Sequence, residues 1–437
     1  MGLNEAGRQI RVFMLGWEFP PFISGGLGTA CYGLTRAMDQ LGVKVTFVLP
    51  KVVDSSYVTH VDLLTPRCCS EQGARMLSEY ELKNVTFETI SSPLQAYATP
   101  QTYDERKEEW LRLQREAQGG GGRDLDQASD YGGNMYEEVR RYATMAMELA
   151  RSVDFDVVHA HDWMTYPAGV AVAAMTGKPL VVHIHSTEFD RSGEHVNQVV
   201  YDIEREGMER ADKVLAVSGF TRGIVIDRYG ISPEKVEVVY NGVERNGQWS
   251  VGEGSIQRDE KLVLFLGRIT MQKGPEYFLH AAKKVLNVMD NVKFVMAGSG
   301  DLMYRSVELA AQLGIGQKVL FTGFLRGDDV RKIYQMADLY VMPSVSEPFG
   351  IAPLEALDND VPVIISKQSG VSEVLKHALK VDFWDVNEMA NKIVAVLRYP
   401  PLQMTLRNHG NFEVRKLRWK DTAQRCIDVY GQLLVTV

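Results

Sequence analysis

Short apolar runs alternate with helix-like segments along most of this chain, and this alternation constrains the fold more than any other feature. In the first half, the runs that indicate buried strands are 11–15, 44–49, 157–160, 180–184 and 213–217. In the second half they are 262–266, 293–297, 319–322, 339–342 and 361–365. Strands that alternate with helices form parallel sheets with helices on both faces. The sequence therefore predicts an α/β protein with two doubly wound, Rossmann-like sheets.

The length of the chain also indicates two domains, because 437 residues exceed the usual size of one. The segment 245–258 is rich in glycine, serine and charge and has no apolar period, so we expect it to be a linker. This places an N-terminal domain over 1–244 and a C-terminal domain over 259–420, with a cleft between them. The charged stretch 104–127 contains four consecutive glycines and is expected to be a mobile insertion.

Composition argues against several classes of protein. The formal net charge is -8 and no basic cluster stands out, which argues against a nucleic-acid partner. The cysteines Cys31, Cys68, Cys69 and Cys426 lack metal-binding spacing, as expected for reduced thiols in the cytoplasm. Residues 1–10 lack an apolar signal core, and no apolar run approaches the ~20 residues of a membrane span. We therefore expect a cytoplasmic protein without a membrane span, and these features leave its oligomeric state open.

Two glutamates, Glu347 and Glu355, lie on either side of an expected helix start in the second half. Glu347 falls in a strand-to-helix loop, at the sheet edge where α/β proteins bind ligands. The amides of Phe349, Gly350 and Ile351 begin the helix, and free amides with the helix dipole favour a phosphate. Glu355 lies one turn further on, where it could accept hydrogen bonds from sugar hydroxyls. The motif predicts a site for a phosphorylated sugar donor; the alternative is two solvated glutamates.

A second motif places two cations at another strand-to-helix turn. Arg268 and Lys273 follow the apolar run 262–266 and precede a helix that opens at Pro275. Arginine offers a planar fork and lysine a mobile point charge, so the pair could neutralise a departing diphosphate. The alternative is ordinary surface charge.

A glycine-rich loop follows the first strand. Gly25 and Gly26 precede a helical stretch, and glycine lets a backbone amide approach a sugar diphosphate closely. A dinucleotide-binding G-x-G-x-x-G directly after the first strand is absent, which argues against a dehydrogenase. A purely structural turn is the alternative.

Together with Trp17-Glu18-Phe19-Pro20-Pro21, Gly25-Gly26-Leu27-Gly28 and the segment 157–163, these motifs resemble the retaining glycosyltransferases of the GT-B fold. That group, of the glycosyltransferase family 4 type, includes glycogen and starch synthases. The resemblance implies two Rossmann-like domains that face a cleft, with a nucleoside diphosphate sugar as co-substrate and no cofactor. It also implies transfer of a hexose, glucose in the first place, to a sugar or glucan hydroxyl. Another donor sugar and a lipid, polysaccharide or small-molecule acceptor are the alternative.

The resemblance also implies roles for individual residues. His161 would border the reacting sugar, and Arg268 and Lys273 would hold the departing diphosphate. Glu347 would contact the donor sugar or stabilise the cationic transition state, and Glu355 would bind the ribose. These roles describe a catalytic set shared between the two domains.

At two positions near the paired glycines this chain departs from the glycogen synthases. Glycogen synthases carry a lysine and an aspartate where this chain has Ile23 and Thr29, so we expect a different or looser choice of donor. Whether these residues exclude ADP-glucose is not fixed by the sequence. The last segment, 421–437, is expected to form a helix that returns to the first domain.

Histidine pairs raise the question of a metal. His159 with His161 and His183 with His185 alternate at strand ends, so each pair could face one way and bind an ion. The segment Asp154-Phe155-Asp156 has the DxD form found in metal-dependent glycosyltransferases of another fold, but it enters a strand rather than ending one. We expect a metal-independent enzyme in which cationic side chains and helix amides replace the metal.

Two rival functions remain open at this stage. A nucleotide-sugar epimerase would need a catalytic acid or base and would convert the donor without an acceptor. A non-catalytic sensor would bind nucleoside diphosphate sugars without transfer or slow hydrolysis.

Overall fold

The computed structural model describes residues 9–19, 25–51, 84–91, 135–243 and 260–435. Several features of interest lie outside these residues: Pro20, Pro21, Ile23, Cys68, Cys69, the expected insertion 104–127 and the expected linker 245–258.

The first half of the chain forms a parallel sheet of seven strands in the order β3-β2-β1-β4-β5-β6-β7. Its strands are β1 Arg11–Leu15, β2 Lys44–Lys51, β3 Val85–Ser91, β4 Val157–His161, β5 Leu180–Ile184, β6 Lys213–Ala216 and β7 Val236–Val238. Its helices are α1 Gly26–Gln40, α5 Met135–Ala150, α6 Tyr166–Thr176, α7 Glu188–Ser192, α8 Gln198–Arg210 and α9 Gly219–Tyr229, with 3-10 turns η1 Trp163–Thr165 and η2 Pro233–Lys235.

The second half forms a parallel sheet of six strands in the order β10-β9-β8-β11-β12-β13. Its strands are β8 Lys261–Leu266, β9 Val292–Ala297, β10 Val319–Gly323, β11 Leu339–Met342, β12 Val363–Ser366 and β13 Leu379–Val381. Its helices are α10 Pro275–Leu286, α11 Met303–Gln312, α12 Asp328–Met336, α13 Ile351–Asp358, α14 Val371–Val374, α15 Val386–Arg398 and α16 Pro400–Val414, with 3-10 turns η3 Met271–Lys273 and η4 Gly316–Lys318. The prediction of two doubly wound α/β sheets is confirmed.

The order of strands reverses once in each sheet, between β1 and β4 and between β8 and β11. Open parallel sheets bind ligands outside the carboxyl ends of the strands at such a reversal. The loop after β1 leads to Gly25 and Gly26, and β4 ends at His161. The loop after β8 carries Arg268 and Lys273, and the loop after β11 carries Glu347. Every strand that flanks a reversal thus leads into one of the motifs singled out in the sequence.

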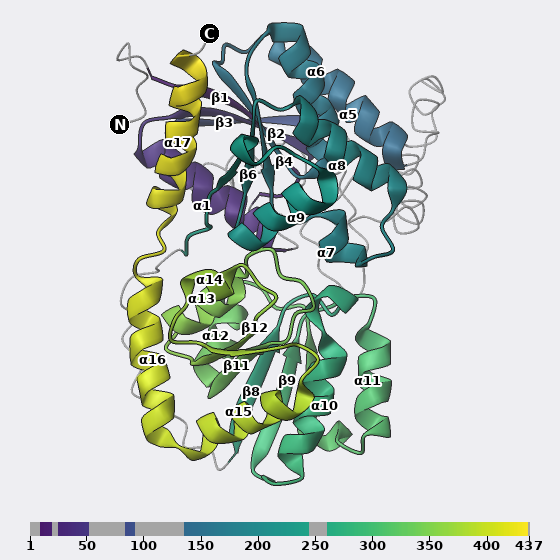
Figure 1. The fold of residues 1–437 in the computed structure, drawn as a ribbon, viewed down its shortest axis with the longest axis vertical. Helices are drawn as coiled ribbons and strands as arrows, with labels where there is room; N and C mark the ends of the chain where they lie inside the picture. Colours follow the sequence, from purple (N-terminus) through teal and green to yellow (C-terminus); the bar gives the residue numbers. More distant parts are fainter. Residues whose placement is uncertain (1–8, 20–24, 52–83, 92–134, 244–259, 436–437) are drawn as a thin grey trace, which may run out of the picture.

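The last helix, α17 Trp419–Val435, lies against the first sheet and not against the second (Figure 1). Figure 1 shows α16 and α17 in yellow along one side of the molecule, running from the second domain to the first. Trp419, Cys426 and Tyr430 of α17 belong to the apolar core of the first domain. Gly33 of α1 permits this packing, since a Cβ there would lie 2.1 Å from the Trp419 ring. No helix among the described residues is long and apolar enough to cross a membrane.

Candidate functional site

An ion pair joins the two motifs of the second domain. The Lys273 Nζ lies 2.5 Å from Glu347 Oε2, and the Ser344 hydroxyl donates to the same oxygen at 3.1 Å. The side chains of Lys273 and Glu347 are 19% and 9% exposed. The pair lies where β8 and β11 end as neighbouring strands, so sheet order alone brings together residues 74 positions apart.

Backbone contacts fix the two loops against each other. The Val345 amide donates to the Gln272 carbonyl at 2.9 Å, and the Arg268 Nη2 donates to the Gln272 Oε1 at 3.1 Å. Gly274 has a φ of 65°, and a Cβ there would lie 2.2 Å from the Pro343 carbonyl oxygen. Only glycine combines that backbone conformation with so close an approach. Arg268 and Lys273 are therefore held on one rigid turn beside Glu347.

The α13 helix begins as the sequence predicts, at Ile351. Gly350 precedes it with a φ of 105°, and no side chain of the described residues caps the helix. Phe349 is buried, and its carbonyl accepts from the Val371 amide at 2.7 Å. A helix start without a capping side chain offers its amides and the positive end of its dipole to an anion.

Glu355 lies one turn into α13 and already has a partner. The Tyr334 hydroxyl donates to Glu355 Oε2 at 3.1 Å. Burial raises the pKa of the Glu355 carboxyl above its ordinary value, although the Tyr334 hydrogen bond lowers it. The carboxylate is thus oriented by Tyr334, and its contact with a ribose stays a prediction.

His161 ends β4 in the first domain and is fully buried. Its Nδ1 lies 2.9 Å from the His185 Nε2, while its Nε2 has no partner among the described residues. Burial lowers the pKa of His161 well below its ordinary value, and nearby histidines lower it further. The ring is therefore neutral at pH 7, with Nδ1 held by His185 and Nε2 buried without a hydrogen bond to any described residue.

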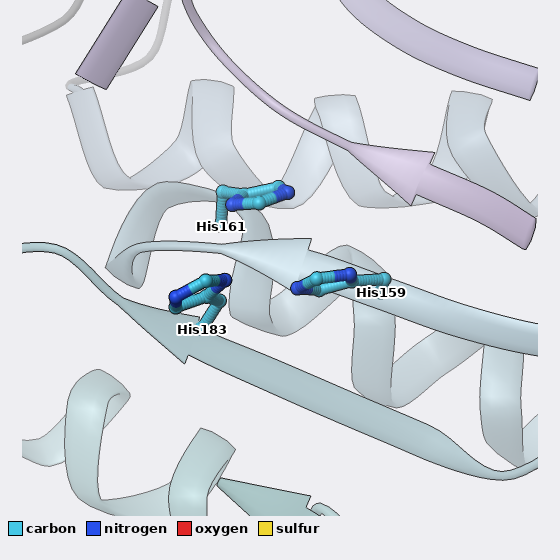
Figure 2. Close-up of side chains that lie close together, drawn as sticks. All are labelled: His159, His161 and His183. Carbon is cyan, nitrogen blue, oxygen red and sulfur yellow. The ribbon is translucent and has the colours of Figure 1, made fainter. Parts of the chain in front are cut away.

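Figure 2 shows that His159, His161 and His183 lie close together. One nitrogen of each lies within 4.8 Å of the others. The rings are nearly parallel, with interplanar angles of 24° for His159 and His161, 14° for His159 and His183, and 29° for His161 and His183. Imidazole lone pairs lie in the ring plane, so the rings would have to turn before all three could bind one metal ion. The Tyr430 hydroxyl, 2.6 Å from the His159 Nδ1, already engages one of these nitrogens.

The DxD segment lies at the opposite edge of the first sheet. Arg11 opens β1 and pairs with both aspartates: its Nη2 is 2.7 Å from Asp156 Oδ1, and its Nη1 contacts Asp154. Asp156 directly precedes β4, so the segment lies at the amino ends of the strands, away from the carboxyl edge where His161 lies. Asp154 and Asp156 serve as partners of Arg11 in this arrangement.

The glycine loop has a partner that the sequence did not suggest. Gly26 begins α1 with Gly25 before it, and a Cβ at Gly26 would meet open space. The buried Glu18 accepts the Gly28 amide at 2.9 Å, so a carboxylate lies at the first turn of this helix. Within the described ranges, no hydrogen bond joins Gly25, Gly26 or His161 to the second domain.

Comparison with known proteins decides the family. The model "Glycosyl transferases group 1" matches residues 251–411, and the model "Glycosyltransferase Family 4" matches residues 99–246. An uncharacterized glycosyltransferase of Methanocaldococcus jannaschii is 33% identical over 442 residues, covering 96% of this chain and 98% of the relative. This chain is a GT-B glycosyltransferase of the family 4 type.

Other relatives of this glycosyltransferase differ in what they act on. A D-inositol 3-phosphate glycosyltransferase of Salinispora tropica is 28% identical over 309 residues, which cover 64% of each chain. The glycogen synthase of Mycobacterium tuberculosis is 23% identical over 372 residues, covering 84% of this chain and 80% of the relative.

Solved structures share the fold. Sucrose-phosphate synthase from Thermosynechococcus elongatus has a TM-score of 0.69 at 19% identity, covering 98% of this chain and all of the other. Anabaena HepE in complex with UDP-glucose also has a TM-score of 0.69, at 18% identity and 98% coverage of this chain. The GT-B arrangement expected from the motifs is therefore confirmed.

Asp162, which follows His161 in the glycosyltransferase, gives a pH-dependent prediction. It has a φ of 59°, and its Oδ1 accepts the amides of His185 at 2.7 Å and Ser186 at 3.4 Å. Burial raises the pKa of Asp162 from 3.8 to about 7. The folded state therefore binds more protons than the unfolded state between those pH values, and this group's contribution to stability falls as pH rises through that window.

We expect Asp162→Asn to keep the acceptor and tolerate the positive φ while removing the titration. The free energy of unfolding of the variant, relative to wild type, should rise from pH 4.5 to pH 7.5 by up to about 3 kcal/mol. Urea unfolding at both pH values measures this, with exposed Asp301→Asn as the control. A difference that is flat across the window would contradict the shifted pKa.

Proposed function

We propose that this glycosyltransferase transfers a hexose, glucose in the first place, from a nucleoside diphosphate sugar to a hydroxyl of a sugar or glucan, with retained anomeric configuration. The observation that carries the proposal is the contact of Lys273 with Glu347. In this contact, a cation that could bind the diphosphate lies within hydrogen-bonding distance of a carboxylate that could bind the sugar. A nucleoside diphosphate sugar needs both groups there, because the bond that breaks joins its sugar to its diphosphate.

Names of relatives and structural neighbours support the donor class. HepE is described in complex with UDP, with UDP and glucose, and with UDP-glucose. A galactosyltransferase relative from Escherichia coli, 24% identical over 304 residues, uses UDP-galactose according to its name. A nucleoside diphosphate hexose is therefore the first substrate to test.

Charge separation is the step that this site would assist. As the bond from the sugar C1 to the diphosphate oxygen breaks, negative charge grows on the leaving group and positive charge grows on the sugar. Arg268 and Lys273 would stabilise the first charge, with the amides at the start of α13, and Glu347 the second. Lys273 would exchange part of its contact with Glu347 for the phosphate oxygens.

Retention follows in this proposal from attack on the same face that the diphosphate leaves. The acceptor oxygen would form its bond to C1, and a phosphate oxygen of the leaving group would take the hydroxyl proton, so atoms and charge balance. Neutral His161 would orient the sugar through its Nε2, which has no partner among the described residues. Glu355 would bind the ribose.

A second candidate keeps the chemistry and changes the substrates. Relatives include an enzyme named for D-inositol 3-phosphate and one named for a diphosphoundecaprenol acceptor. Transfer of another donor sugar to a lipid, polysaccharide or small-molecule acceptor is therefore the alternative.

The test is product formation from UDP-, ADP- and GDP-linked glucose, mannose and galactose with maltooligosaccharides and with inositol phosphate as acceptors. Nuclear magnetic resonance would read the new linkage. We expect an α-glucosyl product from an α-linked donor. A β linkage would overturn retention, and transfer of only mannose or galactose would overturn the glucosyl proposal. Donor turnover without an acceptor product would favour an epimerase, and binding alone a sensor.

Metal independence is tested separately. We expect turnover in excess EDTA to stay within about twofold of turnover in magnesium, because Arg268 and Lys273 would supply the charge that a metal would otherwise provide. The measurement compares initial rates of enzyme dialysed against EDTA with rates after added magnesium, manganese or zinc. Loss of activity that an added metal restores would contradict metal independence and would favour a metal ion held by His159, His161 and His183.

A further inference from the structure

The two domains meet at the loop between β11 and α13, residues 343–350, which carries Glu347 and is called the donor loop below. The hydroxyls of Ser218 and Thr221, at the start of α9, donate to the Pro348 carbonyl at 2.5 and 3.1 Å. The Glu373 carboxylate of α14 accepts the Gly219 amide at 2.9 Å and the Phe220 amide at 2.5 Å. The α9 helix therefore docks on the donor loop of the other domain.

This α9 contact lies beside the crossover between the domains, which is formed by α16 and α17. The Tyr240 hydroxyl donates to Glu373 at 3.1 Å, and the Tyr240 carbonyl accepts the Thr422 hydroxyl of α17 at 2.8 Å. One residue thus connects the docking of α9 with the helix that crosses between the domains. If the domains rotated about α16 and α17, a contact this close to those helices would move little.

A second contact between the domains lies farther from the crossover, where α7 faces η3. The Ser346 hydroxyl, one residue before Glu347, donates to Asp190 Oδ1 at 2.5 Å. The α7 helix also packs against η3, the turn that contains Lys273. Figure 1 places α7 on the opposite side of the interface from the α16–α17 crossover. Rotation about the crossover would therefore separate Asp190 from Ser346 before it disturbs α9.

Asp190 is held ready for this contact by its own helix. Its Oδ2 accepts the amide and the hydroxyl of Thr187 at 2.7 and 2.8 Å, in a reciprocal capping box. The side chain is buried, and this bonding directs Oδ1 towards Ser346. Thr187 and Asp190 both support α7, but of the two only Asp190 makes this contact with the second domain.

We propose that Asp190 is a positioning residue that fastens the donor loop when the domains close. It acts through Ser346, because the residues before and after Ser346 are both bonded to η3. The Val345 amide donates to the Gln272 carbonyl, and Glu347 pairs with Lys273. Closure would thereby lock Lys273 and Glu347 in the geometry that charge separation needs. The proposal rests on the transfer function given above and adds the element of the acceptor-side domain that completes the site.

Ser346→Ala tests this with the capping box of α7 left intact. We expect kcat to fall about tenfold, the size of one lost hydrogen bond to a charged group. The dissociation constant of UDP, or of the diphosphate that proves to bind best, should change less than twofold. The reason is that Arg268, Lys273 and the amides at the start of α13 all lie in the second domain. Ser346→Thr keeps the hydroxyl and should recover most of the rate. The matched control is Ser372→Ala, whose hydroxyl bonds carbonyls of its own domain.

A second pair of variants separates positioning from support of the helix. Thr187→Ala and Asp190→Ala both break the capping box, so both should lower the melting temperature. Asp190→Ala also removes the contact with Ser346 and should lower kcat about tenfold below Thr187→Ala. Equal kcat values for these two variants, or a wild-type kcat for Ser346→Ala, would overturn the proposal.

Small-angle X-ray scattering distinguishes this proposal from the function on which it rests, since it needs no sugar acceptor. Ser346→Ala should show a larger radius of gyration than wild type with saturating nucleoside diphosphate. An unchanged radius would overturn the role of Ser346 and Asp190 in closure. An enlarged radius in a protein that transfers no sugar would support the fastening contact and reject the transferase function.

Discussion

Replacing Lys273 with alanine is expected to lower turnover by roughly 100-fold or more, the size seen when one preorganised charge-stabilising group is removed. Its ammonium is the cation nearest to Glu347 in the described structure, at 2.5 Å, and it lies on a turn that Gly274 and Gln272 hold rigid. Initial rates with saturating donor and acceptor measure the effect. The exposed Lys284→Ala on α10 is the control for general loss of charge.

The ion pair changes what this variant does to folding. The sequence predicted Lys273 only as a cation for the departing diphosphate, and the structure adds its ion pair with Glu347. In the structure, Lys273→Ala leaves the buried Glu347 carboxylate without its cation, which should lower the free energy of unfolding by about 1 to 3 kcal/mol. The double variant Lys273→Ala with Glu347→Gln should regain much of that stability without regaining turnover.

Arg268→Ala should also lose roughly 100-fold in turnover, because its guanidinium lies on the same turn as Lys273, where it donates a hydrogen bond to Gln272. Wild-type rates in both single variants would reject the assignment of these cations to the leaving group. Recovery of turnover in the double variant would show that the loss came from the unpaired glutamate.

The strands that sequence reasoning found and missed differ in where they lie in the sheets. The central strands are covered by helices on both faces and are nearly continuously apolar, so runs such as 11–15, 180–184 and 339–342 gave the observed bounds. The three missed strands, β3, β7 and β13, all lie at sheet edges. The segments Val236–Val238 and Leu379–Val381 are only three residues long and carry a charged residue at the centre, so no periodic signal exceeds that of a loop.

The candidate site shows a similar limit. Positions in the turns after β8 and β11 could be predicted because local signals, an apolar run followed by proline or glycine, place them. The contacts of Lys273 with Glu347 and of Asp190 with Ser346 could not, because they join loops 74 and 156 residues apart. Such pairs follow from strand order and from how the domains meet, and a single sequence contains neither. The hydrogen bond that Glu18 accepts from the Gly28 amide could not be predicted for another reason, since a bond to a backbone amide leaves no pattern of residue types in the sequence.

Gly274→Ala is expected to have a large effect on the site although it adds only one methyl group. Two separate costs arise there: the φ of 65° disfavours any side chain, and the new Cβ would lie 2.2 Å from the Pro343 carbonyl oxygen. The first costs about 1 to 2 kcal/mol. The second requires backbone movement between η3 and the end of β11, which should bring the total to about 3 kcal/mol or more and displace Lys273 from Glu347.

Gly314→Ala isolates the first cost, because Gly314 has a φ of 68° and open space around its Cβ position. Urea unfolding should show about 1 to 2 kcal/mol lost in Gly314→Ala and clearly more in Gly274→Ala. Turnover should be near wild type in the first variant and reduced at least tenfold in the second, since a misplacement of about 1 Å at charged groups is enough to slow the reaction strongly. Equal losses of stability in the two variants would mean that the turn yields to the methyl group, and that Lys273 does not depend on the close approach of Gly274 to Pro343.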